Sequence, residues 1–115
     1  MTYRLAFASS DGKNVNEHFG RAKDFVIIEI NNKESKYIET RINKNPLNKC
    51  GHDEGYIDEL INVISDCRGV FVAKMGKKAA SKLRLSNIQG FEMPYGINEI
   101  VEKVVSGKYK FFKFE

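Results

Sequence analysis

The 115-residue chain has the size of a single domain, and its 42% hydrophobic and 30% charged residues are ordinary for a globular protein. Its 19 basic and 15 acidic residues give a net charge of +4 without a basic run or a nucleic-acid-binding motif, so nucleic-acid binding is not expected. No apolar run is long enough for a membrane span or a signal peptide. Because only two cysteines are present, a reducing cytoplasm is the expected location.

The first half of the chain is expected to form three strands. An apolar run predicts a strand over residues 3–8, and a run that is apolar on both faces predicts another over 23–31. After a polar turn, residues 36–43 alternate, which predicts a hairpin with the second strand and a place at or near the sheet edge. The alternation places Tyr37, Glu39 and Arg41 on one face, and Ile38, Thr40 and Ile42 on the other.

The second half has the strand and helix rhythm that builds a parallel sheet. The expected elements are a helix over 53–67, a strand over 70–73, a helix over 77–85, a strand over 88–93 and a helix from Ile97 to a stop at Gly107. Asp53 is the expected N-cap of the first helix, and Gly69 its expected end. Cys67 is expected on the buried face of that helix.

This order predicts an α/β domain over residues 1–107, with a mixed five-stranded sheet and helices on both faces. A tail rich in aromatic residues and lysine follows over 108–115. We expect the tail to form an extra edge strand or an arm packed on the body, with a dimer contact as the alternative.

Polar turns between the first two strands carry the residues best suited to binding. One is Ser9-Ser10-Asp11-Gly12, and the other is Asn16-Glu17-His18-Phe19-Gly20 with one of the two histidines. A second segment, Lys74–Lys78, stands where a strand gives way to a helix, and amides at a helix N-terminus favour anions. The alternative is that these lysines simply point into water. If the first and fourth strands are neighbours, both segments line one crevice at the carboxyl ends of the strands.

Soft metal ligands are also present. Cys50 and His52 lie two residues apart in a predicted loop, and with His18 they form a set that suits zinc, copper or iron. The alternative is that these side chains are only solvated. The chain has no phosphate-binding loop, dinucleotide fingerprint or Cys-x-x-Cys pair, and Ser9 or Ser10 with His18 and Asp11 lacks a nucleophile elbow. No enzyme is expected.

Several motifs in order resemble the dinitrogenase iron–molybdenum cofactor biosynthesis family. They are Phe7–Lys13, Val15–Gly20, Phe25–Glu29, Asp66-Cys67 before a strand, and Ala73–Gly76 followed by Ala79-Ala80. The resemblance implies a ribonuclease H-like three-layer fold. It also implies a non-catalytic protein that carries the iron–molybdenum cofactor, or an iron–sulfur precursor, between nitrogenase cofactor-assembly proteins. The radical-SAM motif of some family members is absent, so this chain is not expected to build a cluster by that route.

The resemblance makes His18 the expected cluster contact. With the crevice, it yields the candidate cofactor-binding residues Ser9, Ser10, Asp11, Gly12, Asn16, His18, Phe19, Gly20, Lys74, Gly76 and Lys77, and the candidate metal ligands His18, Cys50 and His52. A monomer or weak homodimer without membrane contact is expected. The alternatives are a protein for another metal–sulfur cluster, a regulatory or scaffold protein, and a nuclease of the same fold, which would need several convergent carboxylates to hold Mg²⁺.

Overall fold

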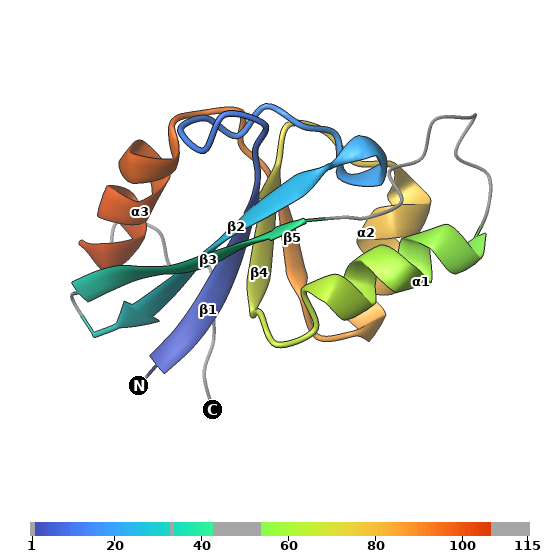
Figure 1. The fold of residues 1–115 in the computed structure, drawn as a ribbon. Helices are drawn as coiled ribbons and strands as arrows, with labels where there is room; N and C mark the ends of the chain where they lie inside the picture. The colour runs from blue at the N-terminus through green and yellow to red at the C-terminus, as the bar shows by residue number, and fades with distance from the viewer. Residues whose placement is uncertain (1, 33, 43–53, 107–115) are drawn as a thin grey trace.

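The structure is a computed structural model that describes residues 2–32, 34–42 and 54–106, with the side chains of 54–56 excepted. Its elements are β1 (Thr2–Ala8), the 3-10 helix η1 (Phe19–Arg21), β2 (Asp24–Asn31), β3 (Glu34–Ile42), α1 (Glu54–Val63), β4 (Gly69–Val72), α2 (Lys77–Leu85), β5 (Gln89–Glu92) and α3 (Ile97–Val105) (Figure 1). No helix among the described residues is long and apolar enough to cross a membrane.

The strands form one mixed sheet in the order β3-β2-β1-β4-β5, which confirms the predicted five-stranded α/β fold. β2 pairs antiparallel with both β1 and β3, whereas β4 pairs parallel with both β1 and β5. The adjacency of β1 and β4 is the condition that the crevice hypothesis requires. β3 lies at an edge of the sheet, as its alternating sequence predicts.

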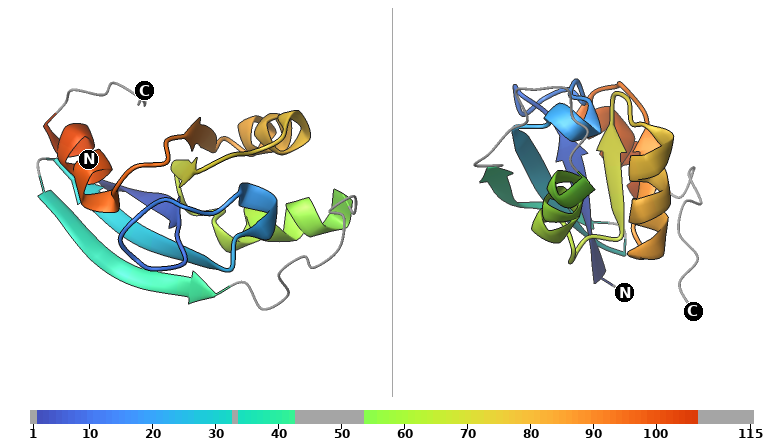
Figure 2. Two further views of the ribbon diagram at one scale, coloured as in Figure 1. Left: turned by 90° about the horizontal axis from the view of Figure 1, so that it is seen from above. Right: turned by 90° about the vertical axis from the view of Figure 1, so that its right-hand side faces the viewer.

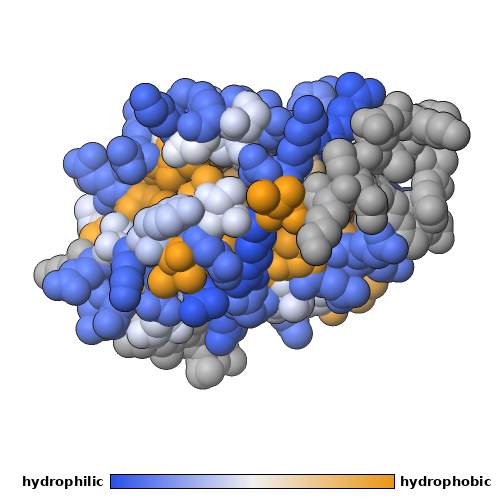
Figure 3. All heavy atoms as spheres, in the orientation of Figure 1, coloured by the Kyte–Doolittle hydropathy of each residue, from blue (hydrophilic) through white to orange (hydrophobic). Residues whose placement is uncertain are grey.

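Helices cover both faces of the sheet, with α1 and α2 on one side and α3 on the other (Figure 2). The α3 side of the core contains the apolar positions of that helix, spaced three and four residues apart: Ile97, Ile100, Val101 and Val104. The other side contains residues of α1 and α2, such as Leu60 and Leu83. Side chains of the strands alternate between the two cores. On the surface, hydrophilic residues surround smaller apolar patches (Figure 3).

The helix predicted over 53–67 ends earlier, because α1 stops at Val63. Shorter turns follow, in which the Ile64 N–H donates to Ile61 and the Cys67 N–H donates to Ile64. The prediction of Gly69 as the helix end is wrong, since this residue begins β4. Cys67 is buried as expected, with 3% of its surface exposed, but it lies beyond the helix. Asp53, the stop at Gly107 and the tail lie outside the described residues.

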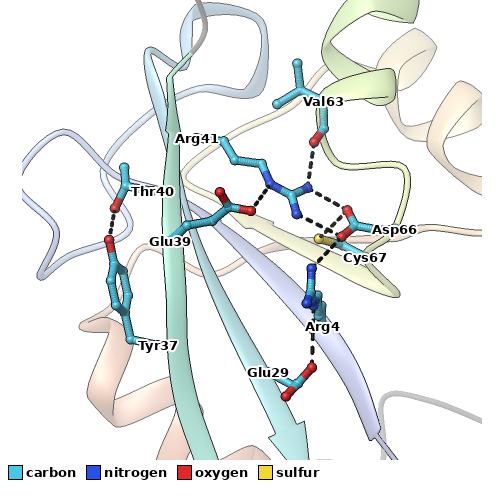
Figure 4. Close-up of polar contacts among 9 residues, drawn as sticks. All are labelled: Arg4, Glu29, Tyr37, Glu39, Thr40, Arg41, Val63, Asp66 and Cys67. Atoms are coloured by element: carbon cyan, nitrogen blue, oxygen red, sulfur yellow. Dashed lines mark hydrogen bonds and ion pairs between the residues drawn. The ribbon is translucent and has the colours of Figure 1, made fainter.

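A β-bulge overturns the predicted faces of β3. Ile27 pairs with Glu39 and Ile28 pairs with Tyr37, so Ile38 is an extra residue on β3. The hydroxyls of Tyr37 and Thr40 lie 2.8 Å apart on the side of α3, whereas Glu39 points to the other side (Figure 4). The predicted grouping of Tyr37 with Glu39 is therefore wrong. A simple alternation of side chains holds only where no residue is inserted.

Candidate functional site

The loop that follows β1 is organised around the carboxylate of Asp11. Its Oδ1 atom accepts hydrogen bonds from the N–H groups of Lys13 and Asn14, each at 2.8 Å, and from the Ser9 hydroxyl at 3.0 Å. These contacts, that of the Asn14 N–H first, hold the pKa of the exposed carboxyl well below its usual range. The Gly12 N–H donates to Ser9 Oγ at 2.9 Å, and its φ of 73° suits glycine. Local contacts thus define the first turn.

Hydrogen bonds of Asn16 stabilise the second turn of the same loop. Its Oδ1 atom accepts the N–H of Ser10 at 2.9 Å, and its Nδ2 atom donates to the Ser10 hydroxyl at 3.0 Å. The Asn16 N–H donates to the carbonyl of Ala8, the last residue of β1. Ser10 and Asn16 are both exposed, so they hold the loop in shape at the surface.

The segment after β4 lies beside this loop. The Phe19 N–H donates to the Lys74 carbonyl, and the Ala73 N–H donates to the Glu17 carbonyl, each at 2.9 Å. Between these two contacts, His18 and Lys74 form a parallel β-bridge. Both residues are exposed, whereas the Phe19 ring is fully buried. The buried ring anchors the loop, and the bridge keeps the exposed residues His18 and Lys74 side by side along the backbone.

A third segment, between β5 and α3, joins the same edge. The Val15 N–H donates to Tyr95, and the Ile97 N–H donates to Lys13. The loops after the three strands therefore meet at one end of the sheet (Figure 1). Sequence reasoning missed Tyr95, which is half exposed. The Pro-Tyr-Gly turn after β5 could have indicated its position, because the carboxyl ends of parallel strands lie at the same edge of a sheet.

Met75, the next residue in the chain, helps to fix the position of Lys74. The Met75 N–H donates to the Glu92 carboxylate at 2.8 Å, and its side chain packs against the core on the α2 side. A Cβ atom on Gly90 would lie only 2.8 Å from the Met75 sulfur, so the side chain occupies space that glycine leaves open. The strand β5 thus supports the segment that carries the lysine.

The start of α2 is suited to an anion. Gly76 is its N-cap and supplies no capping side chain, and the first turn contains no acid. Lys77 and Lys78 are exposed there, at the end of the helix dipole that disfavours cations. A bound anion would offset that repulsion and meet the helix amides.

The predicted site residues are thus brought together only in part. The exposed ones near this edge are Ser10, Asp11, Gly12, Asn16, His18, Lys74, Gly76 and Lys77, while Gly20 is partly buried within η1. The side chains of Ser9 and Phe19 are buried and support the loop. Cys50 and His52 lie outside the described residues. In residues 2–32, 34–42 and 54–106, no three His, Cys, Asp or Glu side chains are grouped to hold a metal ion.

An ion-pair network that sequence reasoning missed lies on the α1 side of the sheet (Figure 4). Arg41 donates to both oxygens of Asp66, at 2.5 and 2.8 Å, and to the carbonyl of Val63 at 2.8 Å. Arg4 also donates to Asp66, at 3.1 Å. Arg41 above all holds the pKa of Asp66 well below its usual range. Burial, followed by the charge of Asp66, raises the pKa of Cys67 to about 12.

Fold and site together define a small α/β protein that presents an exposed histidine beside a lysine-bearing segment. The chain matches the family described as "Dinitrogenase iron-molybdenum cofactor" over residues 1–107, and it belongs to that family.

Two named relatives are longer than this chain. The FeMo cofactor biosynthesis protein NifB of Bradyrhizobium diazoefficiens is 30% identical over 89 residues, which cover 77% of this chain and 18% of NifB. Protein NifX of Azotobacter vinelandii is 27% identical over 101 residues, which cover 86% of this chain and 63% of NifX. The chain thus spans less than a fifth of the first relative and less than two thirds of the second. The crystal structure of PH0822 shares the fold, with a TM-score of 0.70 at 21% identity over 93% of each chain.

Proposed function

We propose that this protein is a non-catalytic carrier of an anionic metal–sulfur cluster, either the iron–molybdenum cofactor or an iron–sulfur precursor of it. Membership of the family and the similarity to the FeMo cofactor biosynthesis protein NifB and to protein NifX support a role in assembly of this cofactor. The observation that carries the proposal is the bridge between His18 and Lys74, which places an exposed imidazole beside a basic segment.

The chemistry of this edge suits such a cargo. An imidazole is a good ligand for iron, and the exposed side chain of His18 makes no capping hydrogen bond to η1. Lys74 and Lys77 supply positive charge, and the start of α2 supplies amides for the sulfur-rich, negative surface. Cys50 and His52 are proposed as further ligands. Cys67 is not, because its thiol is buried and its pKa is raised to about 12.

The proposal also covers the fold type, the partners and the compartment of the protein. The order β3-β2-β1-β4-β5 supports a ribonuclease H-like fold. Other nitrogenase cofactor-assembly proteins are the proposed partners, and the cytoplasm is the proposed compartment. A carrier needs a site that releases its cargo, and an exposed ligand on a surface loop satisfies this requirement better than a closed cage does.

The test is an anaerobic titration of the purified protein with isolated iron–molybdenum cofactor or its precursor cluster, followed by absorbance and metal analysis. We expect stoichiometric binding that His18→Ala weakens by about tenfold or more, the loss of one direct contact. Asn98→Ala, at an exposed position of α3, is the matched control and should bind as the wild type does. Equal binding by His18→Ala and wild type would contradict the assignment of His18.

Two other outcomes would change the proposal. If the protein bound a plain iron–sulfur cluster more tightly than the iron–molybdenum cofactor or its precursor, the result would favour a carrier for another metal–sulfur cluster. Absence of all cluster binding, with retained affinity for an assembly protein, would favour a scaffold. A nuclease assay with Mg²⁺ tests the non-catalytic part directly, because robust cleavage by the wild-type chain would overturn it.

A further inference from the structure

We propose that the outer edge of β3 pairs with β3 of a second copy of this chain, antiparallel and about a two-fold axis. β3 is nine residues long and ends the sheet, and no described strand pairs with its outer edge (Figure 2). Seven of its nine residues are exposed. An edge strand with unpaired backbone groups is a template for another strand.

The bulge at Ile38 determines which side chains share a face. Glu39 and Arg41 pair with Ile27 and Phe25, which belong to the core on the α1 side. Lys36 pairs with Glu29, whose ion pair with Arg4 places it on the same side. Without the bulge, Lys36 and Glu39 would lie on opposite faces, because they are three residues apart. With it, the charged residues of β3 line one face.

This shared face allows a register in which the whole strand pairs and all four of its charged residues meet an opposite charge. If the two-fold axis passes between Tyr37 and Ile38, then Lys36 of each copy lies opposite Glu39 of the other. In the same register, Glu34 lies opposite Arg41, and symmetry repeats both pairs. Opposite charges directly across an antiparallel ladder are stabilising. Lys36 and Glu34 form no ion pair within the described part of the chain, so both can take part.

Other registers are disfavoured by the same charges. A shift by two residues, the smallest that keeps side chains on matching faces, sets Lys36 opposite Arg41 or Glu34 opposite Glu39. Both place like charges across the ladder. Charges and bulges ordinarily protect an edge strand from pairing. Here the charges disfavour the registers shifted by two residues and favour the full-length register, in which each charged residue of one copy meets an opposite charge on the other.

Apolar surface lies on the same strand. Tyr37 and Ile42 are 60% and 68% exposed, which makes them two of the four large hydrophobic residues that are exposed in the described chain. Tyr37 would lie next to the two-fold axis, where its ring would be covered by the second copy. Electrostatic pairing therefore coincides with the burial of an exposed ring.

Sedimentation equilibrium of the full chain over a range of concentrations tests the proposal. The wild type should form a reversible dimer that weakens as salt rises. Lys36→Glu places like charges opposite each other twice, and it should weaken the dimer by about tenfold or more. The double variant Lys36→Glu with Glu39→Lys reverses both charges and should restore the dimer. Arg84→Glu, the control at the far end of α2, should leave it unchanged.

A wild type that stays monomeric at every soluble concentration would overturn the proposal, as would a folded double variant that fails to recover the dimer. Circular dichroism shows whether each variant folds, because Glu39 also contacts Arg41. If the double variant does not fold, amide hydrogen exchange of the wild type decides. The β3 amides should exchange more slowly as protein concentration rises, and no change with concentration would contradict the pairing.

Discussion

The N–H of Phe19 donates a 2.9 Å hydrogen bond to the carbonyl of Lys74, and so joins the loop after β1 to the segment after β4. The buried ring of Phe19 lies 6.2 Å from that of Phe25, and this packing holds the donor in place. The exposed side chain of His18, one residue earlier, is consequently held next to Lys74. The position of the candidate ligand depends on the hydrophobic core beneath it. Five predictions test how the fold supports this edge and the core and ion-pair network around it.

Loss of the Asp11 carboxylate should loosen the loop after β1. In Asp11→Ala the N–H groups of Lys13 and Asn14 lose their acceptor, so their hydrogen exchange should become faster. Ser35→Ala, an exposed position on β3, is the control and should leave these amides unchanged.

The same carboxylate predicts a pH dependence. Because the folded pKa of Asp11 is lowered, its stabilising effect is present above its unfolded pKa of about 3.9 and is lost as pH falls through the folded value. Thermal melts of wild type and Asp11→Asn should therefore differ at pH 7 and converge in strong acid. If the difference in melting temperature between the two proteins grew as pH fell, the predicted direction of this pH dependence would be wrong.

Arg41 should stabilise the end of α1. Arg41→Ala leaves the Val63 carbonyl without this donor and Asp66 without its two strongest contacts, so the free energy of unfolding should fall by about 1–2 kcal/mol. Arg41→Lys keeps the charge but not the paired geometry, and it should recover only part of the loss. Urea unfolding measures both variants. An unchanged midpoint for Arg41→Ala would mean that the network adds nothing.

Cys67 should be unreactive in the folded protein. Its thiol is buried, and with a pKa of about 12 it is almost entirely protonated at pH 7. In a Cys50→Ser background, where Cys67 is the remaining cysteine, a disulfide reagent should react slowly in buffer and rapidly in denaturant. Rapid reaction in buffer, at the rate of a free thiol peptide, would contradict the buried position.

Gly90→Ala should destabilise the fold through Met75. The added methyl group would approach the Met75 sulfur and terminal carbon to 2.8 Å and Leu83 to 3.2 Å. Because these Met75 atoms are the far end of a flexible side chain that can move aside, the cost should be at most about 1 kcal/mol. In a Met75→Ala background the same change should cost less than half as much, because most of the clash is gone. Thermal melts of the four proteins measure this coupling, and strictly additive effects would show that Met75 does not fill this space.

Short-range patterns predicted much of the architecture. The apolar spacing of α3 and the bounds of α2 can be derived from neighbouring residues, because burial of one helix face requires a period near 3.6. The same holds for the two-sided burial of β2 and the edge position of β3. Glycine-bearing polar turns between buried strands also pointed to the loop that carries His18.

Tertiary contacts decided the rest. The bulge at Ile38, the end of α1 at Val63 and the meeting of Asp66 with Arg41 all depend on residues distant in sequence, which no local pattern pairs. Residue order and local periodicity were enough to predict the family, most of the strands and helices, and the loop of the candidate site. Only the tertiary structure brought His18 beside Lys74, because that required β1 and β4 to be neighbours in one sheet.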